Sequence, residues 1–446
     1  MNASRTADAR FLGIDIGTTT LSFAVISRAE ARVIHTLTIP NDSALPSPGM
    51  QDAVQIADLA LAAAASLISQ YPGVCSIGVT GQMHGVVCLN NGGVPVSPLY
   101  TWQCPLADEG LCHEIREKTG MRVHPGYGHA TLYALARQGG IPSQAAQYCT
   151  IMDYIVMRLT GRSAPMIHAT NAASLGLYDL TRSSFDEAAL RALELPLRTP
   201  ETTAQECICG HYHGIPVCAA IGDNQASFYG SVRDEAHSVL VNYGTGSQLS
   251  LITDSPIAPP GCEIRHYPGG KYLLCKSALC GGRAYAMLER FFAGYMHAVC
   301  GKASPQYETM NQLALQAYRD QIRLRVNTQF CGTREDPSLR GSMLGIGEGN
   351  FTPGAMILGV LQGMVDELSA AFDPAAHPGM RTLVASGNAV QKNPVLRMLL
   401  RDTFSLPLAL PMQREEAAFG AALCAAASTK IVSPVQAKAL IAYTDC

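Results

Sequence analysis

The stretch FLGIDIGTTTLSFAVIS, residues 11–27, decides the fold of this chain. Two apolar runs flank a Gly-Thr-Thr turn, and each run has the β-branched and aromatic content that is typical of a strand. The stretch therefore predicts a β-hairpin that turns at residues 17–19. One carboxylate, Asp15, lies within the first apolar run, where an unpaired charge would be costly to bury. A strand-end Asp can bond to turn amides, but the apolar surroundings favour a functional role.

A second hairpin of the same design begins near Val239, in VLVNYGTGSQLSLI. Glycine lets a bulky anion approach the backbone, and consecutive N–H groups with Thr or Ser hydroxyls can bind phosphate. Either turn alone is more often an ordinary hairpin turn, and neither is a Walker loop or a dinucleotide fingerprint. The pair, one in each half of the chain, predicts two phosphate-binding turns. Asp15 beside the first turn would repel phosphate unless a cation such as Mg²⁺ lay between them.

Size and composition restrict the classes of function. The chain has 446 residues, which suggests two or three domains, and its 48% hydrophobic and 15% charged residues indicate a globular protein. A net charge of −3 gives no electrostatic signature of nucleic-acid or anionic-membrane binding. We therefore expect small-molecule partners, with a homodimer left open.

The chain shows no feature of export or membrane insertion. Its polar start, MNASRTADAR, lacks the apolar core of a signal peptide, and AVQIADLALAAAASLI reads as a packed helix that is too short and too weakly apolar to span a bilayer. The 15 scattered cysteines are then expected to be reduced thiols of a cytoplasmic protein. The segment CICGHYHG alternates Cys and His, but four ligands on one straight strand cannot surround zinc, so we expect a surface hairpin or loop there.

Strands and helices alternate along the chain, which predicts an α/β fold. The polar bridge SVRDEAHS divides the two hairpin-led halves, so we place the domains at residues 1–236 and 237–446. Two further strand ends carry polar residues. Asp223 opens the helix after IPVCAAIG, either as an N-cap or as a general base, and Gly387-Asn388 follow the strand TLVAS. Asn393 is the expected N-cap of the next helix.

These motifs together resemble the FGGY carbohydrate kinases of the actin-like ATPase superfamily. The resemblance covers nearly the whole chain, in order: GIDIGTTT at 13–20, TGQMHGVV at 80–87, TWQ at 101–103, MDYIVMRLTG at 152–161, GDNQAS at 222–227, NYGTGS at 242–247, CGGR at 280–283, ASGNAVQKNP at 385–394 and EEAAFGAALCA at 415–425. The single motifs are weakly specific, whereas the ordered set is strongly specific. It implies two actin-like, ribonuclease H-like domains with a central cleft that binds ATP and Mg²⁺.

The resemblance also implies roles for individual residues. Asp223 would be the catalytic base, and Asp15 and Asp223 would hold Mg²⁺. The sugar site would be lined by Gln82, Met83, His84, Trp102, Gln103, Asp223, Asn224 and Gln225. ATP would contact Gly17, Thr18, Thr19, Gly244, Thr245, Gly246, Gly282, Gly387, Asn388 and Asn393.

The motif GQMHG is similar to the ketose-phosphorylating branch of the family, and the implied substrate is sedoheptulose. Xylulose or another ketose stays an alternative, because Cys104 stands where the family usually has an Asp. Asp108 is the candidate to supply that carboxylate instead. A protein that uses nucleotide only as a switch is the alternative from another class, and the sugar-site motifs argue against it.

Overall fold

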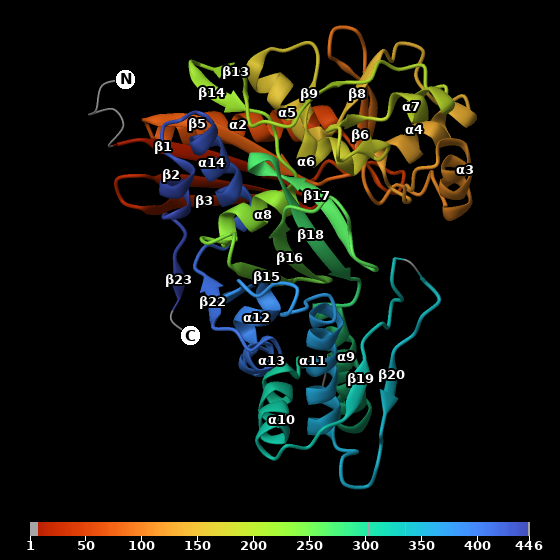
Figure 1. Ribbon diagram of the computed structural model, residues 1–446, viewed down its shortest axis with the longest axis vertical. Helices are drawn as coiled ribbons and strands as arrows, with labels where there is room; N and C mark the ends of the chain where they lie inside the picture. Colours follow the sequence, from red (N-terminus) through yellow and green to blue (C-terminus); the bar gives the residue numbers. More distant parts are fainter. Residues whose placement is uncertain (1–7, 302–303, 335, 445–446) are drawn as a thin grey trace. The chain divides into compact units, whose positions relative to one another are not determined.

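The computed structural model describes residues 8–301, 304–334 and 336–444 of the chain (Figure 1). The first few residues of the polar start therefore lie outside the described residues. The chain forms two compact units. Unit 1 comprises residues 1–233, 265–272 and 413–442, and unit 2 comprises residues 234–264, 273–412 and 443–446.

Unit 1 is built on a six-stranded sheet in the order β13-β14-β5-β1-β2-β3. The predicted hairpin is confirmed, because β1 (Arg10–Ile16) and β2 (Thr20–Ser27) pair antiparallel with Ile16 opposite Leu21. Strand β3 (Arg32–Pro40) extends the hairpin, and β5 (Val74–Gly81) runs parallel to β1. Strands β13 (Ile208–Tyr212) and β14 (Ile215–Cys218) complete the sheet.

A smaller four-stranded sheet and several helices complete unit 1. The sheet contains β4 (Met50–Gln51), β6 (Val86–Leu89), β7 (Pro95–Tyr100) and β8 (Gln147–Cys149). The helices are α2 (Ala53–Gln70), α3 (Glu109–Thr119), α4 (Gly128–Arg137), α5 (Ile151–Thr160), α6 (Ala169–Ala172), α7 (Glu187–Ala192), α8 (Asp223–Ser231), α14 (Glu416–Ser428) and α15 (Pro434–Lys438), with a 3₁₀ turn η1 (Ala173–Leu175). Short strands β9 (Met166–His168), β10 (Tyr178–Asp179), β11 (Ser184–Phe185) and β12 (Glu201–Thr203) connect them.

Helix α14 packs against β1, β5 and α8, and glycines make this packing close (Figure 1). Gly13 of β1 pairs directly with Gly78 of β5. A Cβ atom at Gly13 would lie 1.8 Å from the carbonyl oxygen of Ala418, and one at Gly78 would lie 2.0 Å from that of Ala421. The backbone of α14 therefore lies directly on the sheet. Similarly, a Cβ at Gly420 would lie 1.8 Å from the Ala226 oxygen, so α14 also fixes the position of α8.

Unit 2 repeats the core topology of unit 1 in a seven-stranded sheet, in the order β17-β18-β16-β15-β21-β22-β23. Strands β15 (Ser238–Tyr243) and β16 (Ser247–Thr253) form the second predicted hairpin, and β21 (Thr382–Ser386) runs parallel to β15. The other strands are β17 (Glu263–Tyr267), β18 (Lys271–Ala278), β22 (Leu408–Pro411) and β23 (Tyr443–Thr444), with a separate ribbon of β19 (Arg325–Asn327) and β20 (Ser342–Leu344).

The helices of unit 2 are α9 (Gly282–Cys300), α10 (Tyr307–Arg319), α11 (Pro353–Ser369), α12 (Asn388–Lys392) and α13 (Pro394–Phe404). Helix α11 packs against α9, α10 and α13 (Figure 1). It carries the largest share of the buried apolar core of this unit, from Ala355 to Leu368.

The compact units differ from the predicted division at residue 236 in three segments, of which the shortest, residues 234–236, belongs to unit 2. Residues 265–272, at the end of the β17–β18 hairpin, and residues 413–442, which include α14, belong to unit 1. The sequence order placed both segments with the second half. Glycine-mediated packing of α14 on β1 and β5 explains why the second of these segments joins unit 1.

Helix α2 has the length and hydropathy that a membrane span would need, contrary to our expectation that it is too short and too weakly apolar. Its buried residues Ala53, Ile56, Ala57, Ala60, Ala64 and Leu67 form one stripe along the helix. Such a stripe is typical of a helix that covers a globular core, and α2 contacts α5 and β1.

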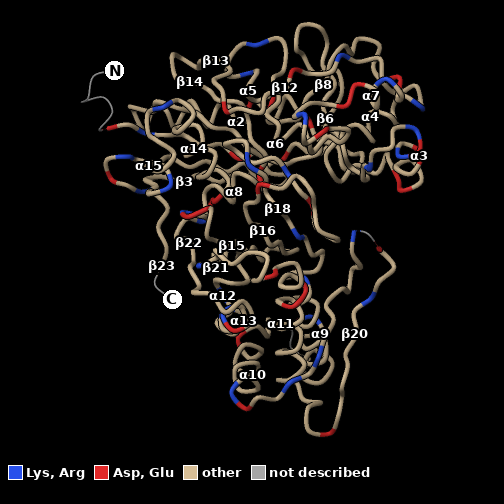
Figure 2. Tube along the Cα trace, in the orientation of Figure 1, with Lys and Arg blue, Asp and Glu red and all other residues tan. Residues whose placement is uncertain are grey.

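The segment CICGHYHG forms part of the β13–β14 hairpin, as expected. Within the described residues, no group of three or more His, Cys, Asp or Glu side chains is arranged to hold a metal ion. The 14 cysteines of the described part are all free thiols. Lys and Arg are interspersed with Asp and Glu along the trace of each unit (Figure 2).

Candidate active site

In the turn between β1 and β2, three consecutive backbone carbonyls accept hydrogen bonds from other residues of unit 1. The carbonyl of Gly17 accepts from the Asn41 side-chain amide at 2.9 Å, that of Thr18 from Gln51 Nε2 at 2.8 Å, and that of Thr19 from the Asn41 backbone N–H at 2.9 Å. In a trans peptide the next N–H points away from each carbonyl. The N–H groups of Thr18 and Thr19 therefore point away from Asn41 and Gln51, which is the orientation that the predicted phosphate-binding turn needs.

Two predicted sugar-site residues meet at Thr18. The Thr18 hydroxyl donates to Gln82 Oε1 at 3.2 Å and accepts from the Trp102 indole N–H at 3.2 Å. Gln82 follows the end of β5, and its backbone N–H donates to the Ile16 carbonyl at 2.8 Å. Trp102 is 48% exposed, so its indole is a surface group and not a core residue. The structure thus joins the turn and part of the predicted sugar site.

The next residues after Gln82 are fixed by different contacts. Met83 is buried, and a Cβ atom at Gly222 would lie 2.8 Å from its sulfur, so Met83 packs at the start of α8. His84 has φ 74°, a conformation that non-glycine residues rarely adopt and that often marks a functional site. Its backbone N–H donates to Ser174 Oγ at 3.1 Å, and its ring stacks on Tyr127 at 4.5 Å.

The residues after Trp102 show the surroundings of Cys104, which stands where the family usually has an Asp. Gln103 is exposed, and its backbone N–H donates to Thr101 Oγ1 at 3.2 Å. Cys104 is buried, its backbone N–H donates to the Thr101 carbonyl at 2.9 Å, and burial raises the pKa of its thiol. Asp108 caps α3 by accepting from the Leu111 N–H at 2.8 Å. Its carboxylate is therefore engaged in helix capping.

Three carboxylates of unit 1 interact near the turn. Burial, followed by the charges of Asp223 and Glu415, raises the pKa of Asp15 to about 7. Glu415 precedes α14 and accepts from the Thr38 hydroxyl at 3.1 Å. These carboxylates repel one another, and a cation near Asp15 would relieve that repulsion. Because Mg²⁺ in phosphoryl-transfer sites usually takes one or two carboxylates plus phosphate and water oxygens, the residues fit such an ion.

Asp223 is the first residue of α8 and does not act as its N-cap. The N-cap is Gly222, for which no side-chain capping bond exists, so one of our two readings of Asp223 is not realised. Burial raises the pKa of Asp223 to about 6, while the Arg265 charge and backbone N–H groups of Asn224 and of Asp223 itself lower it. A carboxylate with such a pKa is ionised at neutral pH yet basic enough to accept a proton.

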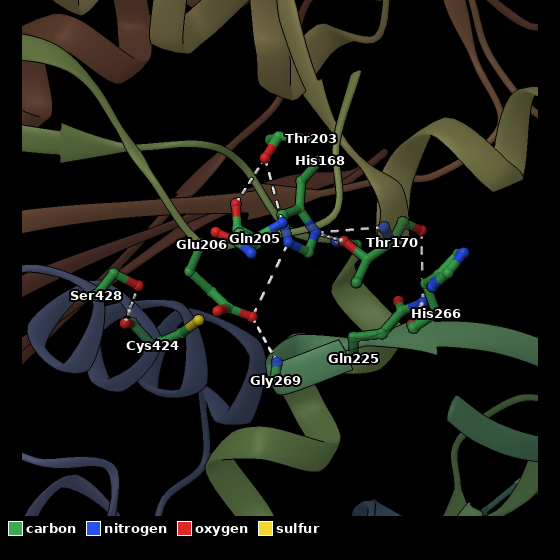
Figure 3. Close-up of polar contacts among 11 residues, drawn as sticks. His168, Thr170, Thr203, Gln205, Glu206, Gln225, His266, Gly269, Cys424 and Ser428 are labelled. Carbon is green, nitrogen blue, oxygen red and sulfur yellow. Dashed lines mark hydrogen bonds and ion pairs between the residues drawn. The ribbon is translucent and has the colours of Figure 1, made fainter. Parts of the chain in front are cut away.

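Gln225, two residues after Asp223 in α8, holds the segment that carries His266 (Figure 3) and, next to it, Arg265. It is fully buried, and its Nε2 donates to the His266 carbonyl at 3.0 Å and lies 3.4 Å from the Thr170 carbonyl. Tyr267 packs on Phe228 of the same helix, with ring centroids 5.5 Å apart. The structure therefore gives Gln225 an anchoring role in addition to the predicted one. Asn224 beside it is half-buried.

A second anchor holds the other end of this segment (Figure 3). Glu206 accepts from the Gly269 N–H at 2.6 Å and lies 4.0 Å from His168 Nε2. His168 is buried, and burial lowers its pKa to about 4, so its ring is neutral. Its Nδ1 contacts the Thr170 hydroxyl at 2.9 Å, and that hydroxyl accepts from the Gly222 N–H at 3.2 Å. The network thus reaches the N-terminus of α8.

The carbonyls of the turn between β15 and β16 in unit 2 also accept hydrogen bonds from the protein. The N–H of Gly282 donates to the Gly244 carbonyl at 2.9 Å, and that of Arg283 donates to the Thr245 carbonyl at 3.0 Å. The next N–H groups, those of Thr245 and Gly246, consequently point away from α9. The Asn41 and Gln51 side chains and the Asn41 N–H hold the first turn, whereas the N–H groups at the start of α9 hold the second.

The loop after β21 lies against the end of β15. Gly387 has φ 93°, and a Cβ atom there would lie 2.4 Å from the Tyr243 carbonyl oxygen, so only glycine fits. Asn388 is exposed at the start of α12. Asn393 caps α13 as predicted, accepting from the Leu396 N–H at 3.0 Å, and its Nδ2 donates to Asn311.

Sequence reasoning missed three residues that shape the site. Glu415 and Arg265 change the electrostatics of Asp15 and Asp223, and Gln51 holds the first turn. Glu415 lies in a motif that we recognised without a role. Arg265 and Gln51 carry no motif signal of their own, and only the fold brings them to the site.

Comparison with known proteins identifies relatives across the whole chain. Residues 10–230 match the model of the FGGY family of carbohydrate kinases, N-terminal domain, and residues 239–429 match that of the C-terminal domain. A human protein named sedoheptulokinase is 28% identical, over 92% of this chain and 96% of its own length. A glycerol kinase of Thermus brockianus is 27% identical, over 92% and 88%.

Solved structures share the fold. A xylulose kinase from Rhodospirillum rubrum has a TM-score of 0.83 at 20% identity, covering 98% of this chain and 93% of that one. A gluconate kinase from Lactobacillus acidophilus has a TM-score of 0.81 at 19% identity, with the same coverage. The fold is thus the two-domain, actin-like fold of sugar kinases.

Proposed function

The chain belongs to the FGGY family of carbohydrate kinases, and on that premise we propose that it transfers the γ-phosphoryl group of ATP to the terminal hydroxyl of a ketose. Sedoheptulose, giving sedoheptulose 7-phosphate, is the substrate we favour. The observation that supports the proposal is the Asp223 carboxylate at the start of α8, which interacts electrostatically with Arg265 and Asp15.

In the proposed reaction, the sugar hydroxyl loses its proton to Asp223 as its oxygen attacks the γ-phosphorus in line, and ADP leaves. Phosphoryl transfer depends on positioning and charge stabilisation, and no phosphoenzyme is needed. The outward N–H groups of the β1–β2 and β15–β16 turns would donate to phosphate oxygens. Asp15, with Asp223, would hold Mg²⁺, which supplies charge neutralisation when bound.

The sugar would contact uncharged groups of unit 1. Trp102 offers an exposed indole face for the C–H surface of a sugar, and His84 offers an imidazole group. Gln82 is buried and would line the site through Thr18, to which it is hydrogen-bonded. Similarity to sedoheptulokinases over 92% of this chain favours sedoheptulose. Cys104 favours a second candidate, xylulose or another ketose. A thiol accepts hydrogen bonds from sugar hydroxyls much more weakly than the carboxylate that the family usually has there.

We propose a cytoplasmic location, since the described cysteines are all free thiols and the reaction consumes ATP. A homodimer stays open within this proposal. ATP and one ketose are the expected partners.

The decisive measurement is ADP release with sedoheptulose, xylulose, ribulose, fructose and glycerol as acceptors, assayed side by side. We expect the largest kcat/KM for sedoheptulose. Asp223→Asn should lower turnover by about 10²–10⁴, as loss of a general base does, while nucleotide affinity is retained. Asp254→Asn, at an exposed aspartate, is the matched control.

Two results would contradict this proposal. Near-wild-type turnover of Asp223→Asn would remove Asp223 from the mechanism. Nucleotide binding without sugar-stimulated ADP release by any acceptor would instead support the nucleotide-switch alternative.

A further inference from the structure

Gln51 lies at the centre of a closed ring of hydrogen bonds that no motif predicted. Its Nε2 donates to the Thr18 carbonyl at 2.8 Å, and its Oε1 accepts from Gln82 Nε2 at 2.8 Å. The ring closes because the Thr18 hydroxyl donates to Gln82 Oε1 at 3.2 Å. Trp102 joins the ring from outside by donating its indole N–H to the same hydroxyl at 3.2 Å.

The backbone explains why Gln51 reaches all of these groups. It is the last residue of β4, and it pairs with Leu99 of β7, three residues before Trp102. Gln51 is 5% exposed and Gln82 is 4% exposed, so both amides are removed from solvent. Buried amides without partners would be costly, and this ring satisfies them.

The ring fixes one orientation for each of its members. A reversed Gln51 amide would place its oxygen against the Thr18 carbonyl and its NH₂ against that of Gln82. The Thr18 hydroxyl has a single proton, which it gives to Gln82, and it accepts from Trp102. The donors and acceptors therefore agree in only one arrangement, and the ring is rigid for that reason.

The ring connects groups that we assign to different substrates. Thr18 belongs to the turn proposed to bind phosphate, and Gln82 and Trp102 belong to the proposed sugar site. Holding the Thr18 carbonyl inward also directs the Thr19 N–H outward, because the peptide is planar and trans. Gln51 itself is buried and belongs to neither set.

We propose that Gln51 is a positioning residue, which holds the phosphate-binding turn and the sugar-binding side chains in one rigid arrangement, so that the affinity for both substrates depends on it. This inference rests on the proposed kinase function. It deepens that function by naming a residue that acts through Thr18 and Gln82 and contacts neither substrate.

The test is the Gln51→Met variant, in which a side chain of similar length makes neither hydrogen bond. We expect the KM for ATP and the KM for the best acceptor sugar each to rise about tenfold, the scale of one lost hydrogen bond to a fixed group. We expect kcat to fall less than either KM rises. Gln55→Met changes an exposed glutamine four residues along the chain and should leave both KM values unchanged.

A merely structural role gives a different pattern. It would lower the melting temperature and the active fraction, and therefore the apparent kcat, with both KM values unchanged; that result, or a rise in only one KM, would overturn the proposal. If Gln51→Met does not fold, Gln51→Asn carries the same test, since its buried amide is one methylene too short to reach both partners.

Failure of the kinase function can be told apart from failure of this inference. If the wild-type protein phosphorylates no sugar, the proposed function fails, and calorimetric titration with a non-hydrolysable ATP analogue decides the role of Gln51. Weaker binding of the analogue to Gln51→Met than to wild type supports the proposal, and equal binding overturns it.

Discussion

At the scale of single residues, the site depends on how carboxylates are tuned by their neighbours. Asp15 and Asp223 are half-buried, and loss of solvation raises the pKa of both carboxyls, yet their further neighbours differ. Asp15 faces other carboxylates, which raises its pKa further, whereas Asp223 has Arg265 and backbone N–H groups, which lower its pKa. Asp15 therefore suits cation binding and Asp223 suits proton transfer.

The pKa of Asp223 gives a pH dependence for activity. Asp223 must be ionised to accept the proton, and its pKa is raised to about 6. At saturating Mg²⁺, which keeps Asp15 ionised, kcat/KM should fall about tenfold per pH unit below that pH and level off above it. Initial rates between pH 5 and 8 at subsaturating sugar would measure this. A profile that is flat down to pH 5 would argue against Asp223 as the base.

Sequence reasoning reached some of these residues and missed others for a physical reason. Asp15 and Asp223 are visible because a charge within or directly after an apolar run requires an explanation. Arg265 is not visible, because it reaches Asp223 only when a distant hairpin folds against α8. Gln51 is equally hidden, since a lone buried glutamine has no sequence signature.

At the scale of elements, the two hairpins and the strand TLVAS were predictable from apolar runs and turn residues, whereas the parallel pairing of β5 with β1 and of β21 with β15 was not predicted. The close approach of α14 was not predicted, although a signal exists. Gly13 and Gly78 are direct partners in neighbouring strands, and this pair forms a flat site for a helix rich in alanine. Matching the two glycines requires the register between β1 and β5, which sequence alone does not supply.

This packing predicts the effect of adding one methyl group. Gly420→Ala would place a Cβ atom 1.8 Å from the Ala226 oxygen, so α14 and α8 must separate. We expect a loss of about 1–3 kcal/mol in unfolding free energy, as overpacking gives, together with reduced turnover because α8 carries Asp223. Denaturant titration and ADP release measure the two effects.

The control for this substitution is another glycine within a helix. Gly294→Ala in α9 meets no atom within 4 Å, and it should stabilise the protein by about 0.5–1 kcal/mol through helix propensity. If both variants have the same stability and activity as wild type, the glycine contact does not position α8.

At the scale of the whole molecule, unit 1 is assembled from three separate segments of the chain. Residues 1–233 supply its sheets, residues 265–272 supply Arg265, and residues 413–442 supply α14. The order of motifs indicated two halves and the family. It could not indicate that residues 265–272 and 413–442 pack with the first half. A linear division assigns segments by sequence position, whereas burial of the β1–β5 face requires α14.

A truncated chain tests this organisation. Residues 1–236 alone should not form a native core, because the face of β1 and β5 that contacts α14 would be exposed. We expect poor solubility and no cooperative thermal transition by near-ultraviolet circular dichroism. Fusing residues 413–442 behind residue 233 through a flexible linker should restore a cooperative transition. Equally cooperative melting of the two proteins would show that α14 is dispensable for folding.

The late position of α14 also has a consequence for synthesis on the ribosome. Helix α8 ends at Ser231 and α14 ends at Ser428, so at bacterial-to-eukaryotic elongation speeds about 10–40 s separate their completion. During that interval the face of β1 and β5 that α14 later covers stays exposed on the nascent chain, where a chaperone can bind it. Chains that terminate before residue 416 lack α14 altogether. Only a chain translated past α14 can therefore bury this face of β1 and β5.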